Sequence, residues 1–264
     1  MAQDHRPLAV VTGASAGIGY QLALHCAHNG YDLVVAADED TISATTEDFK
    51  KAGAMVVEWV QADLSTTDGN DKVYAAAQKL GRPVDALFAN AGRGLGDSFL
   101  DQDWADIEHV IETNVTGTMY LIHKIGRDMR SRGEGKILIT GSIGGYLAGS
   151  YQAVYNATKA CMNLFGAAIR DELKDTGVTV TVLKPGVTDT NFFETASLEG
   201  TPAGEGSKDD PADVAKIGFD ALMRGDADVV YGFKNKVTSA ITNVLPDSLV
   251  AKGHRKMFEP KAAE

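Results

Sequence analysis

The chain has 264 residues, of which 44% are hydrophobic and 23% are charged, a composition typical of an ordinary soluble globular protein. Its formal net charge of −11 argues against a nucleic-acid-binding protein, because phosphate binding needs a basic surface. Two cysteines suit a reducing cytoplasm, no apolar run reaches the ~18 residues of a membrane span, and the polar start at 1–7 is unlike a secretory signal. We therefore expect a cytoplasmic protein with no nucleic-acid partner and no membrane span.

Short apolar runs alternate with longer amphipathic stretches along the chain. The runs expected to form strands lie at 8–12, 32–37, 54–60, 84–89, 136–140 and 178–183. The stretches expected to form helices lie at 17–29, 42–51, 69–80, 104–130 and 152–175, and glycines directly follow several of them. Because the strand runs are uniformly apolar, we expect a parallel sheet with helices covering both faces.

This alternation predicts an α/β fold: a single-domain, Rossmann-like, doubly wound parallel sheet that occupies 1–264. No linker composition divides the chain. The segment at about 187–210, which includes a long polar stretch with Gly and Pro, is expected to be a flexible loop near the substrate. The mildly basic tail at 233–264 is expected to dock on its own or a neighbouring subunit; covering the substrate mouth and touching a membrane surface are the alternatives.

Three glycines, Gly13, Gly17 and Gly19, follow the first predicted strand with the spacing GxxxGxG. The first allows a sharp turn out of the strand, the second allows the backbone to approach a pyrophosphate, and the third allows the next helix to pack close to the sheet. Free N–H groups at the start of that helix favour phosphates. The loop is also compatible with a tight turn that binds nothing, but its place between the first strand and the first helix favours a dinucleotide.

An acidic residue, Asp38, ends the second predicted strand about 20 residues beyond this loop, where an acid can bind ribose hydroxyls. Glu39 and Asp40 add negative charge that would repel the 2′-phosphate of NADP. We therefore expect NAD to be favoured over NADP, unless a lysine at 50 or 51 folds back. Asp63, at the end of the third predicted strand, is expected either to contact the adenine amino group or to cap a helix.

Further motifs follow the later strands. They are Asn90-Ala91-Gly92 after the fourth strand, Asn114 on the long helix, Ser142 after the fifth strand, the pair Tyr155 and Lys159, and Pro185-Gly186 with Thr190 after the sixth strand. Each motif alone is weak. Together with the glycine loop, in this order and spacing, they resemble the classical short-chain dehydrogenase/reductase family over about residues 7–232.

The resemblance implies an NAD(P)-dependent oxidoreductase that transfers a hydride between nicotinamide and a secondary alcohol or ketone. It implies the catalytic residues Asn114, Ser142, Tyr155 and Lys159. It implies a cofactor site formed by Gly13, Ser15, Gly17, Ile18, Gly19, Asp38, Asp63, Leu64, Asn90, Ala91, Gly92, Tyr155, Lys159, Pro185, Gly186, Val187 and Thr190. It also implies a homodimer or homotetramer, formed through the helix that bears Tyr155 and the long helix before it.

Tyr155 and Lys159 are four residues apart on a predicted helix, so they share a face. A cation beside a phenol favours the phenolate, so Lys159 is expected to lower the pKa of Tyr155 from its usual value of ~10. Ser142 is able to hydrogen-bond the substrate oxygen and hold it at the phenol. By resemblance, Asn114 holds a water that links Lys159 to solvent.

Two other functions remain open: an NADPH-dependent ketoacyl-type reductase, and a non-catalytic dinucleotide-binding regulator. The presence of Ser142, Tyr155 and Lys159 together disfavours the regulator.

A helix turn with two histidines and a cysteine, at 25–28, offers too few ligands for a metal site, so no metal is expected. The pair at 192–193, Phe-Phe, is expected to form either an apolar wall of the substrate site or a local core contact.

Overall fold

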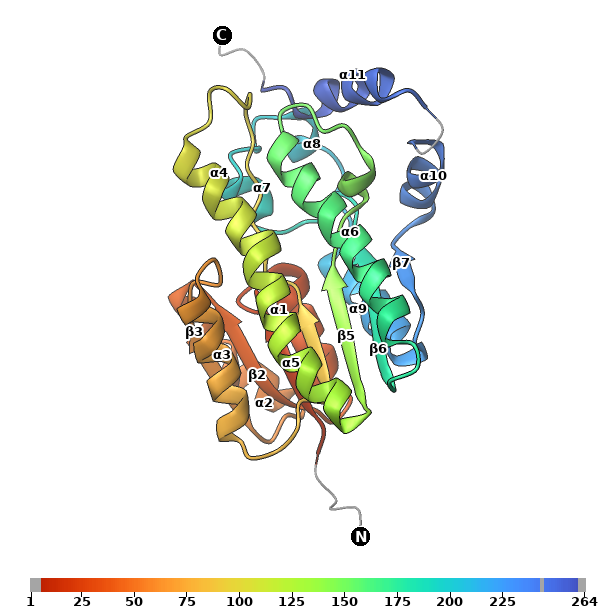
Figure 1. The fold of residues 1–264 in the computed structure, drawn as a ribbon. Helices are drawn as coiled ribbons and strands as arrows, with labels where there is room; N and C mark the ends of the chain where they lie inside the picture. The colour runs from red at the N-terminus through yellow and green to blue at the C-terminus, as the bar shows by residue number, and fades with distance from the viewer. Residues whose placement is uncertain (1–5, 243–244, 261–264) are drawn as a thin grey trace.

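The computed structural model describes residues 6–242 and 245–260, so the extreme ends of the predicted domain and two residues of the predicted tail lie outside the described residues (Figure 1). Seven strands form its sheet: β1 (Leu8–Thr12), β2 (Asp32–Ala37), β3 (Val57–Gln61), β4 (Ala86–Ala89), β5 (Gly135–Thr140), β6 (Val178–Lys184) and β7 (Asp228–Val230). All are parallel, in the order β3-β2-β1-β4-β5-β6-β7. The Rossmann-like, doubly wound fold is therefore confirmed.

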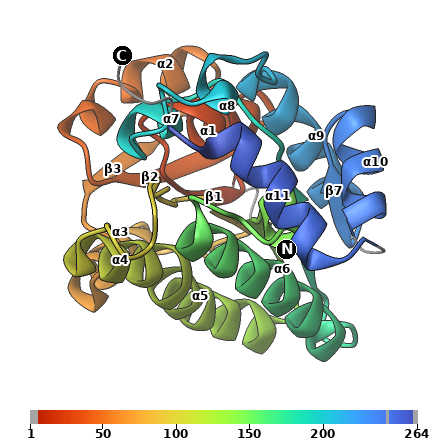
Figure 2. The same ribbon diagram turned by 90° about the horizontal axis from the view of Figure 1, so that it is seen from above.

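Helices cover both faces of the sheet (Figure 2). One face carries α1 (Gly17–His28), α2 (Thr46–Lys51) and α9 (Pro211–Arg224); the other carries α3 (Thr67–Lys79), α4 (Trp104–Ile111), α5 (Thr118–Arg132) and α6 (Ala153–Leu173). Neighbouring strand residues point to opposite faces, so Val11 packs with Leu22 and Phe219, whereas Val10 packs with Leu121. This double burial explains why the central strands are uniformly apolar in sequence.

The chain reverses its direction of travel across the sheet between β1 and β4. The carboxyl ends of the parallel strands all lie at one edge, and the loops that leave β1 and β4 diverge there, which opens a crevice. Figure 1 shows four further helices at this edge, α7 (Phe192–Thr195), α8 (Pro202–Glu205), α10 (Phe233–Thr242) and α11 (Asp247–Phe258). These helices cover the crevice, and none of them was among the helices expected from the sequence.

The sheet differs from its prediction at both edges. The third strand begins at Val57 rather than at 54, and it is an edge strand whose Trp59 is 48% exposed, so it is not buried on both faces. The opposite edge carries β7, a strand of three residues that is too short to leave a periodic pattern. The helix before it, α9, begins at the Asp210 cap, whose side chain accepts a hydrogen bond from the Ala212 backbone N–H at 2.8 Å.

Two of the predicted segments contain elements that the sequence did not indicate. The long helix at 104–130 is interrupted by a π-helical turn, η2 (Glu112–Gly117), between α4 and α5. The predicted flexible loop at 187–210 contains α7 and α8, pairs Thr188 with Asp209 and buries Leu198 completely, so it is not an irregular loop. Two short 3₁₀ helices, η1 (Asp40–Ser43) and η3 (Ile143–Tyr146), complete the connections after β2 and β5.

Candidate active site

A cavity of about 920 Å³ occupies the crevice at the carboxyl ends of the strands. This volume is large enough to hold a cofactor or substrate. It is lined by Ser142, Tyr155 and Lys159 and by the whole predicted cofactor set with one exception. The exception is Gly19, and the predicted catalytic residue Asn114 also lies outside the lining.

The glycine loop between β1 and α1 depends on residues without a side chain. Gly13 and Gly17 have φ values of +65° and +56°, in the left-handed region. A Cβ at Gly17 would lie 2.8 Å from Thr190 Cγ2, and one at Gly19 would lie 2.0 Å from the Gly13 carbonyl oxygen. Gly19 therefore packs α1 against the loop and does not face the cavity. Ala16 provides no side-chain cap, which leaves the first N–H groups of α1 available to an anionic ligand.

The acids after β2 have partners that the sequence prediction did not include. Asp38 accepts a hydrogen bond from Arg93 Nη1 at 2.9 Å, and Glu39 accepts one from Ser15 Oγ at 2.6 Å. The lysines at 50 and 51 pair with acids of their own helix and do not fold back. Arg93 directly follows Asn90-Ala91-Gly92, so its place in the chain is the signal that could have drawn attention to it. It brings a cation to the end of the cavity where only acids were expected.

Two predicted cofactor residues also organise the cavity wall. Asn90 donates a hydrogen bond to the Thr12 carbonyl at 3.1 Å and accepts one from Thr140 Oγ1 at 3.0 Å, which ties β1, β4 and β5 together. Asp63 accepts hydrogen bonds from the backbone N–H and the hydroxyl of Ser65, at 2.9 and 2.7 Å. Asp63 thus shapes the turn that leads into α3 while lining the cavity, and Thr66 is the cap of that helix.

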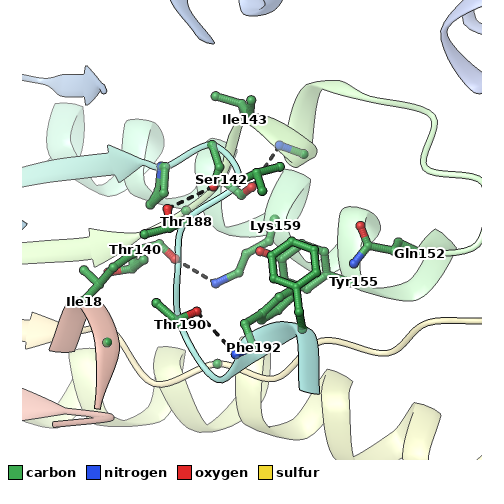
Figure 3. A pocket seen from close by; sticks show the side chains of 18 of the residues that line it. Ile18, Thr140, Ser142, Ile143, Gln152, Tyr155, Lys159, Thr188, Thr190 and Phe192 are labelled. Atoms are coloured by element: carbon green, nitrogen blue, oxygen red, sulfur yellow. Dashed lines mark hydrogen bonds between the residues drawn. The ribbon is translucent and has the colours of Figure 1, made fainter. Parts of the chain in front are cut away.

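Tyr155 and Lys159 project into the cavity from the first two turns of α6 (Figure 3). Lys159 Nζ lies 5.8 Å from the centre of the Tyr155 ring and donates a hydrogen bond to the Thr140 carbonyl at 2.9 Å. The lysine is only 5% exposed. The two residues share a face of the helix, as predicted.

Burial dominates the electrostatics of this pair. It raises the pKa of Tyr155 to about 12, although a hydrogen bond with Ser142 acts in the opposite direction. It lowers the pKa of Lys159 to about 8. The expectation that Lys159 brings the pKa of Tyr155 below its usual value is therefore wrong for the protein alone, because a buried phenolate loses more from missing water than it gains from this cation.

The hydroxyl of Ser142 is held by its own loop. It accepts a hydrogen bond from the Gly144 backbone N–H at 2.9 Å, and Asn163 Nδ2 donates to the Ser142 carbonyl at 2.9 Å. Since the Gly144 N–H occupies a lone pair, the hydroxyl hydrogen is available for Tyr155, and this is the hydrogen bond that opposes the rise in the Tyr155 pKa. The side chain is 7% exposed and lines the cavity.

Asn114 lies behind the cavity wall, in the π-helical turn. Its amide nitrogen donates to the Arg93 carbonyl at 2.9 Å and to Thr158 Oγ1 at 3.0 Å, and its oxygen accepts from the Arg93 N–H at 2.7 Å. Both amide hydrogens are used in this way. Asn114 therefore fixes the backbone beside Gly92 and does not reach the cavity itself.

The other half of the cavity has an apolar wall. Phe192 lies with its ring centre 5.0 Å from that of Tyr155, whereas Phe193 is buried with Leu198 and Phe258. The two alternatives for the Phe-Phe pair therefore both apply, one to each residue. Further apolar lining comes from α11, a helix in the predicted tail. The α11 helix of the tail thus packs on its own chain and also lines the cavity, so the docking expectation and the alternative at the substrate site are compatible.

His254 holds α11 in this place. Its Nδ1 lies 2.8 Å from the Ser150 carbonyl, which can only accept, so Nδ1 carries the hydrogen. Nε2 then accepts from Asn156 Nδ2 at 3.4 Å. Burial lowers the pKa of His254, so the ring stays neutral near neutral pH.

Comparison with known protein families agrees with the fold and with the arrangement of side chains in the cavity. A family profile described as short chain dehydrogenase matches residues 7–199. The chain belongs to this family. As a member, it is an oxidoreductase. A curated relative from Myxococcus xanthus, called an uncharacterized oxidoreductase, is 29% identical over 97% of this chain and 100% of its own length.

Solved structures resemble this short chain dehydrogenase in fold. A short-chain dehydrogenase from Sphingobium yanoikuyae, solved in complex with NADPH, has a TM-score of 0.80 at 23% identity and covers 91% of this chain and 96% of its own. A family member from Burkholderia phymatum, solved in complex with NAD, also has a TM-score of 0.80 at 23% identity, over 91% of this chain and 94% of its own.

Other expectations for this short chain dehydrogenase concern the regions outside the cavity. Cys26 is completely buried in the core, and the His25 ring lies 6.0 Å from that of Phe219, so these side chains serve packing. The described residues contain no group of three or more His, Cys, Asp or Glu side chains able to hold a metal ion. Within residues 6–242 and 245–260, no helix is long and apolar enough to cross a membrane.

Proposed function

We propose that this dehydrogenase transfers a hydride between a nicotinamide cofactor and a carbon that bears a secondary alcohol or ketone, with Tyr155 as the general acid and base. The observation that supports this most is the placement of a partly buried phenol, a buried ammonium and a fixed hydroxyl in the cavity that the glycine loop borders. When bound, the nicotinamide supplies the hydride for reduction or takes it up in oxidation.

The cavity fits such a cofactor. The loop at Gly13 and Gly17 leaves its backbone open to a pyrophosphate, and the uncapped start of α1 offers N–H groups to the same anion. Lys159 places ammonium hydrogens at the cavity wall, where they can bind ribose hydroxyls. Thr190 packs on Gly17 and closes the loop from the other side.

Each catalytic side chain has a role that its surroundings support. When substrate is bound, Ser142 donates its hydrogen to the substrate oxygen instead of to Tyr155 and holds that oxygen beside the phenol. Tyr155, with a pKa of about 12, keeps its proton at neutral pH and gives it to the oxygen of a ketone that is being reduced. Lys159, with a pKa of about 8, is able to pass a proton on near neutral pH. In the oxidation of an alcohol the same proton returns to Tyr155.

The direct test of this function follows the near-ultraviolet absorbance of the reduced cofactor with a panel of secondary alcohols and ketones. We expect turnover of at least one pair in both directions. Cofactor binding without any turnover would contradict the proposal and support the non-catalytic regulator instead.

For the cofactor, we expect NAD to be preferred over NADP, with Asp38 as the selecting residue. Its carboxylate repels a 2′-phosphate, and Arg93 offsets only part of that charge because both side chains of the pair are more than a third exposed. Asp38→Ala removes the repulsion and frees Arg93, so we expect the ratio of kcat/KM for NADP to that for NAD to rise ~10-fold or more. Asp40→Ala is the control, with a smaller change expected, because Asp40 does not line the cavity. A wild-type preference for NADP would contradict this assignment.

We also propose a homodimer or homotetramer formed through the helix that bears Tyr155. Leu164, on the outer side of α6, is 73% exposed, and Trp104 at the start of α4 is 65% exposed. Large apolar side chains this exposed are typical of interfaces when they cluster. Leu164→Glu is expected to shift the protein to a smaller species in size-exclusion chromatography. Met55→Glu, at a position 74% exposed near β3, is the control, and a wild-type monomer would contradict the proposal.

A further inference from the structure

A buried amide beside Tyr155 has no part in the chemistry proposed above. Gln152 directly precedes α6, is 3% exposed and lines the cavity. Among the described residues, none accepts a hydrogen bond from its buried Nε2. Buried amide hydrogens without a partner cost free energy and are rare in folded proteins, so a ligand or a water is expected to complete this one.

The position of Gln152 ties it to the reacting centre. It lies three residues before Tyr155 in the chain, so the two side chains leave the start of α6 on the same side. Figure 3 shows the Gln152 amide next to the Tyr155 ring, with Ser142 on the opposite side of that ring. The amide is therefore placed to reach a substrate group near the reacting oxygen, which Ser142 and Tyr155 hold.

The surroundings of this amide make it selective. Phe192, Leu147 and Met257 line the same cavity, and the neighbouring His254 is neutral. In an apolar site, a neutral N–H group favours a ligand with an oxygen acceptor at that point over one with a methylene there.

A second unpartnered atom, Asn156 Oδ1, belongs to a different part of the wall. It lies 3.2 Å from the place that a Cβ at Gly144 would take, against the loop of Ser142. The Asn156 amide nitrogen is directed to the Leu147 carbonyl and to His254. Asn156 thus supports the Ser142 loop and α11, so of these two amides Gln152 is the one left to bind substrate.

We propose, on the basis of the function proposed above, that Gln152 Nε2 donates a hydrogen bond to a second oxygen of the substrate, one or two carbons from the reacting carbon. The substrate class is then a ketone or secondary alcohol that carries a nearby carbonyl or hydroxyl oxygen and an apolar remainder. The oxygen faces Gln152, and the apolar part packs against Phe192 and α11.

The test compares two pairs of ketones with the same chain length. Ethyl 3-oxobutanoate and 2-heptanone differ by the ester group, which places a second carbonyl two carbons from the ketone, and 3-hydroxy-2-butanone and 2-butanone differ by a hydroxyl on the next carbon. The second oxygen also changes the intrinsic reactivity of the ketone. The readout is therefore the ratio of kcat/KM for the ketone with the second oxygen to kcat/KM for the plain ketone of the same pair. This ratio is compared between the wild type and Gln152→Leu. We expect the ratio to fall ~10- to 100-fold in the variant for at least one pair, with kcat/KM for the plain ketone within about threefold of wild type.

The controls separate this proposal from the one it builds on. Gln78→Leu, on α3 outside the cavity lining, is expected to leave both ratios unchanged. Gln152→Met, which keeps the length of the side chain, gives the same readout if the leucine variant does not fold. An unchanged ratio in a Gln152 variant means that the amide holds only a structural water, and this overturns the inference. An equal loss for both members of a pair indicates a structural role and overturns it as well. Absence of turnover of any ketone by the wild type would refute the proposed function itself.

Discussion

Tyr155→Phe is expected to lower kcat by ~10²- to 10⁴-fold, the range that a positioned general acid or base contributes. The substitution removes only the hydroxyl, so the ring keeps its contact with Phe192 and the cavity keeps its shape. Binding of the cofactor, measured by the fluorescence of its reduced form, is therefore expected to stay within a few-fold of wild type. The loss thus falls on the chemical step and not on cofactor binding.

Tyr31 provides a matched control for this experiment. Burial raises its pKa to about 12, as it does for Tyr155, but its hydroxyl contacts Met223 Sδ at 3.7 Å on the far side of the core. Tyr31→Phe is expected to leave kcat nearly unchanged, which shows that a raised phenol pKa alone has no catalytic effect. If Tyr155→Phe retained turnover within a few-fold of wild type, the proposed acid and base would be wrong.

The sequence predicted the centre of the fold well because its strands are buried on both faces. Val10 and Val11 enter opposite cores, and this leaves an uninterrupted apolar run that single-sequence reasoning detects. The edges of the sheet were missed or misplaced for the opposite reason. Trp59 stands in a strand with one exposed face, and β7 has three residues, so neither leaves a strong pattern. The start of α9 does carry a signal, the Asp210 cap before Pro211, that the sequence analysis did not use.

The predicted site shows a similar division. Residues in contiguous motifs, such as the glycine loop and the Tyr155–Lys159 pair, lie at the cavity because local spacing fixes their geometry. Residues that reach the cavity from distant segments were not found. Arg93 became relevant only through its contact with Asp38, and α11 only through the packing of the tail over the mouth. The pKa of Tyr155 was predicted in the wrong direction because the depth of burial is a property of the folded chain.

Lys159→Met is expected to remove most turnover and, at the same time, to stabilise the fold. Loss of the ammonium takes away the proposed ribose contact and the cation beside Tyr155, and we expect kcat/KM to fall ~10²-fold or more. Burial lowers the pKa of Lys159 from 10.5 to about 8, so the charged form opposes folding near neutral pH. At about 1.4 kcal/mol for each pKa unit, its removal is expected to raise the free energy of unfolding by on the order of 3–4 kcal/mol.

The pH dependence of this gain gives a sharper test. Below pH 8 the lysine is charged in both the folded and the unfolded state, so the whole free-energy cost of burying the ammonium is present. Between about pH 8 and 10.5 the folded state releases the proton first, and this cost disappears. The difference in unfolding free energy between Lys159→Met and wild type, measured in urea, is therefore expected to shrink from pH 7 to pH 10. Above pH 10 the pKa of Tyr155, raised to about 12, makes the wild type lose stability as pH rises, so the comparison ends there.

Lys184 is the matched control for the stability change. It is also buried, at 8% exposure, but it forms an ion pair with Asp228. Burial is the largest single influence and would lower its pKa, but the hydrogen bonds and charge interactions with Asp228 and Tyr146 together outweigh burial, and the net shift is upward. Lys184→Met leaves that carboxylate without its cation, so we expect it to destabilise the protein. If both methionine variants changed stability in the same direction, or if the gain at Lys159 did not depend on pH, a buried charge that opposes folding would not be the cause.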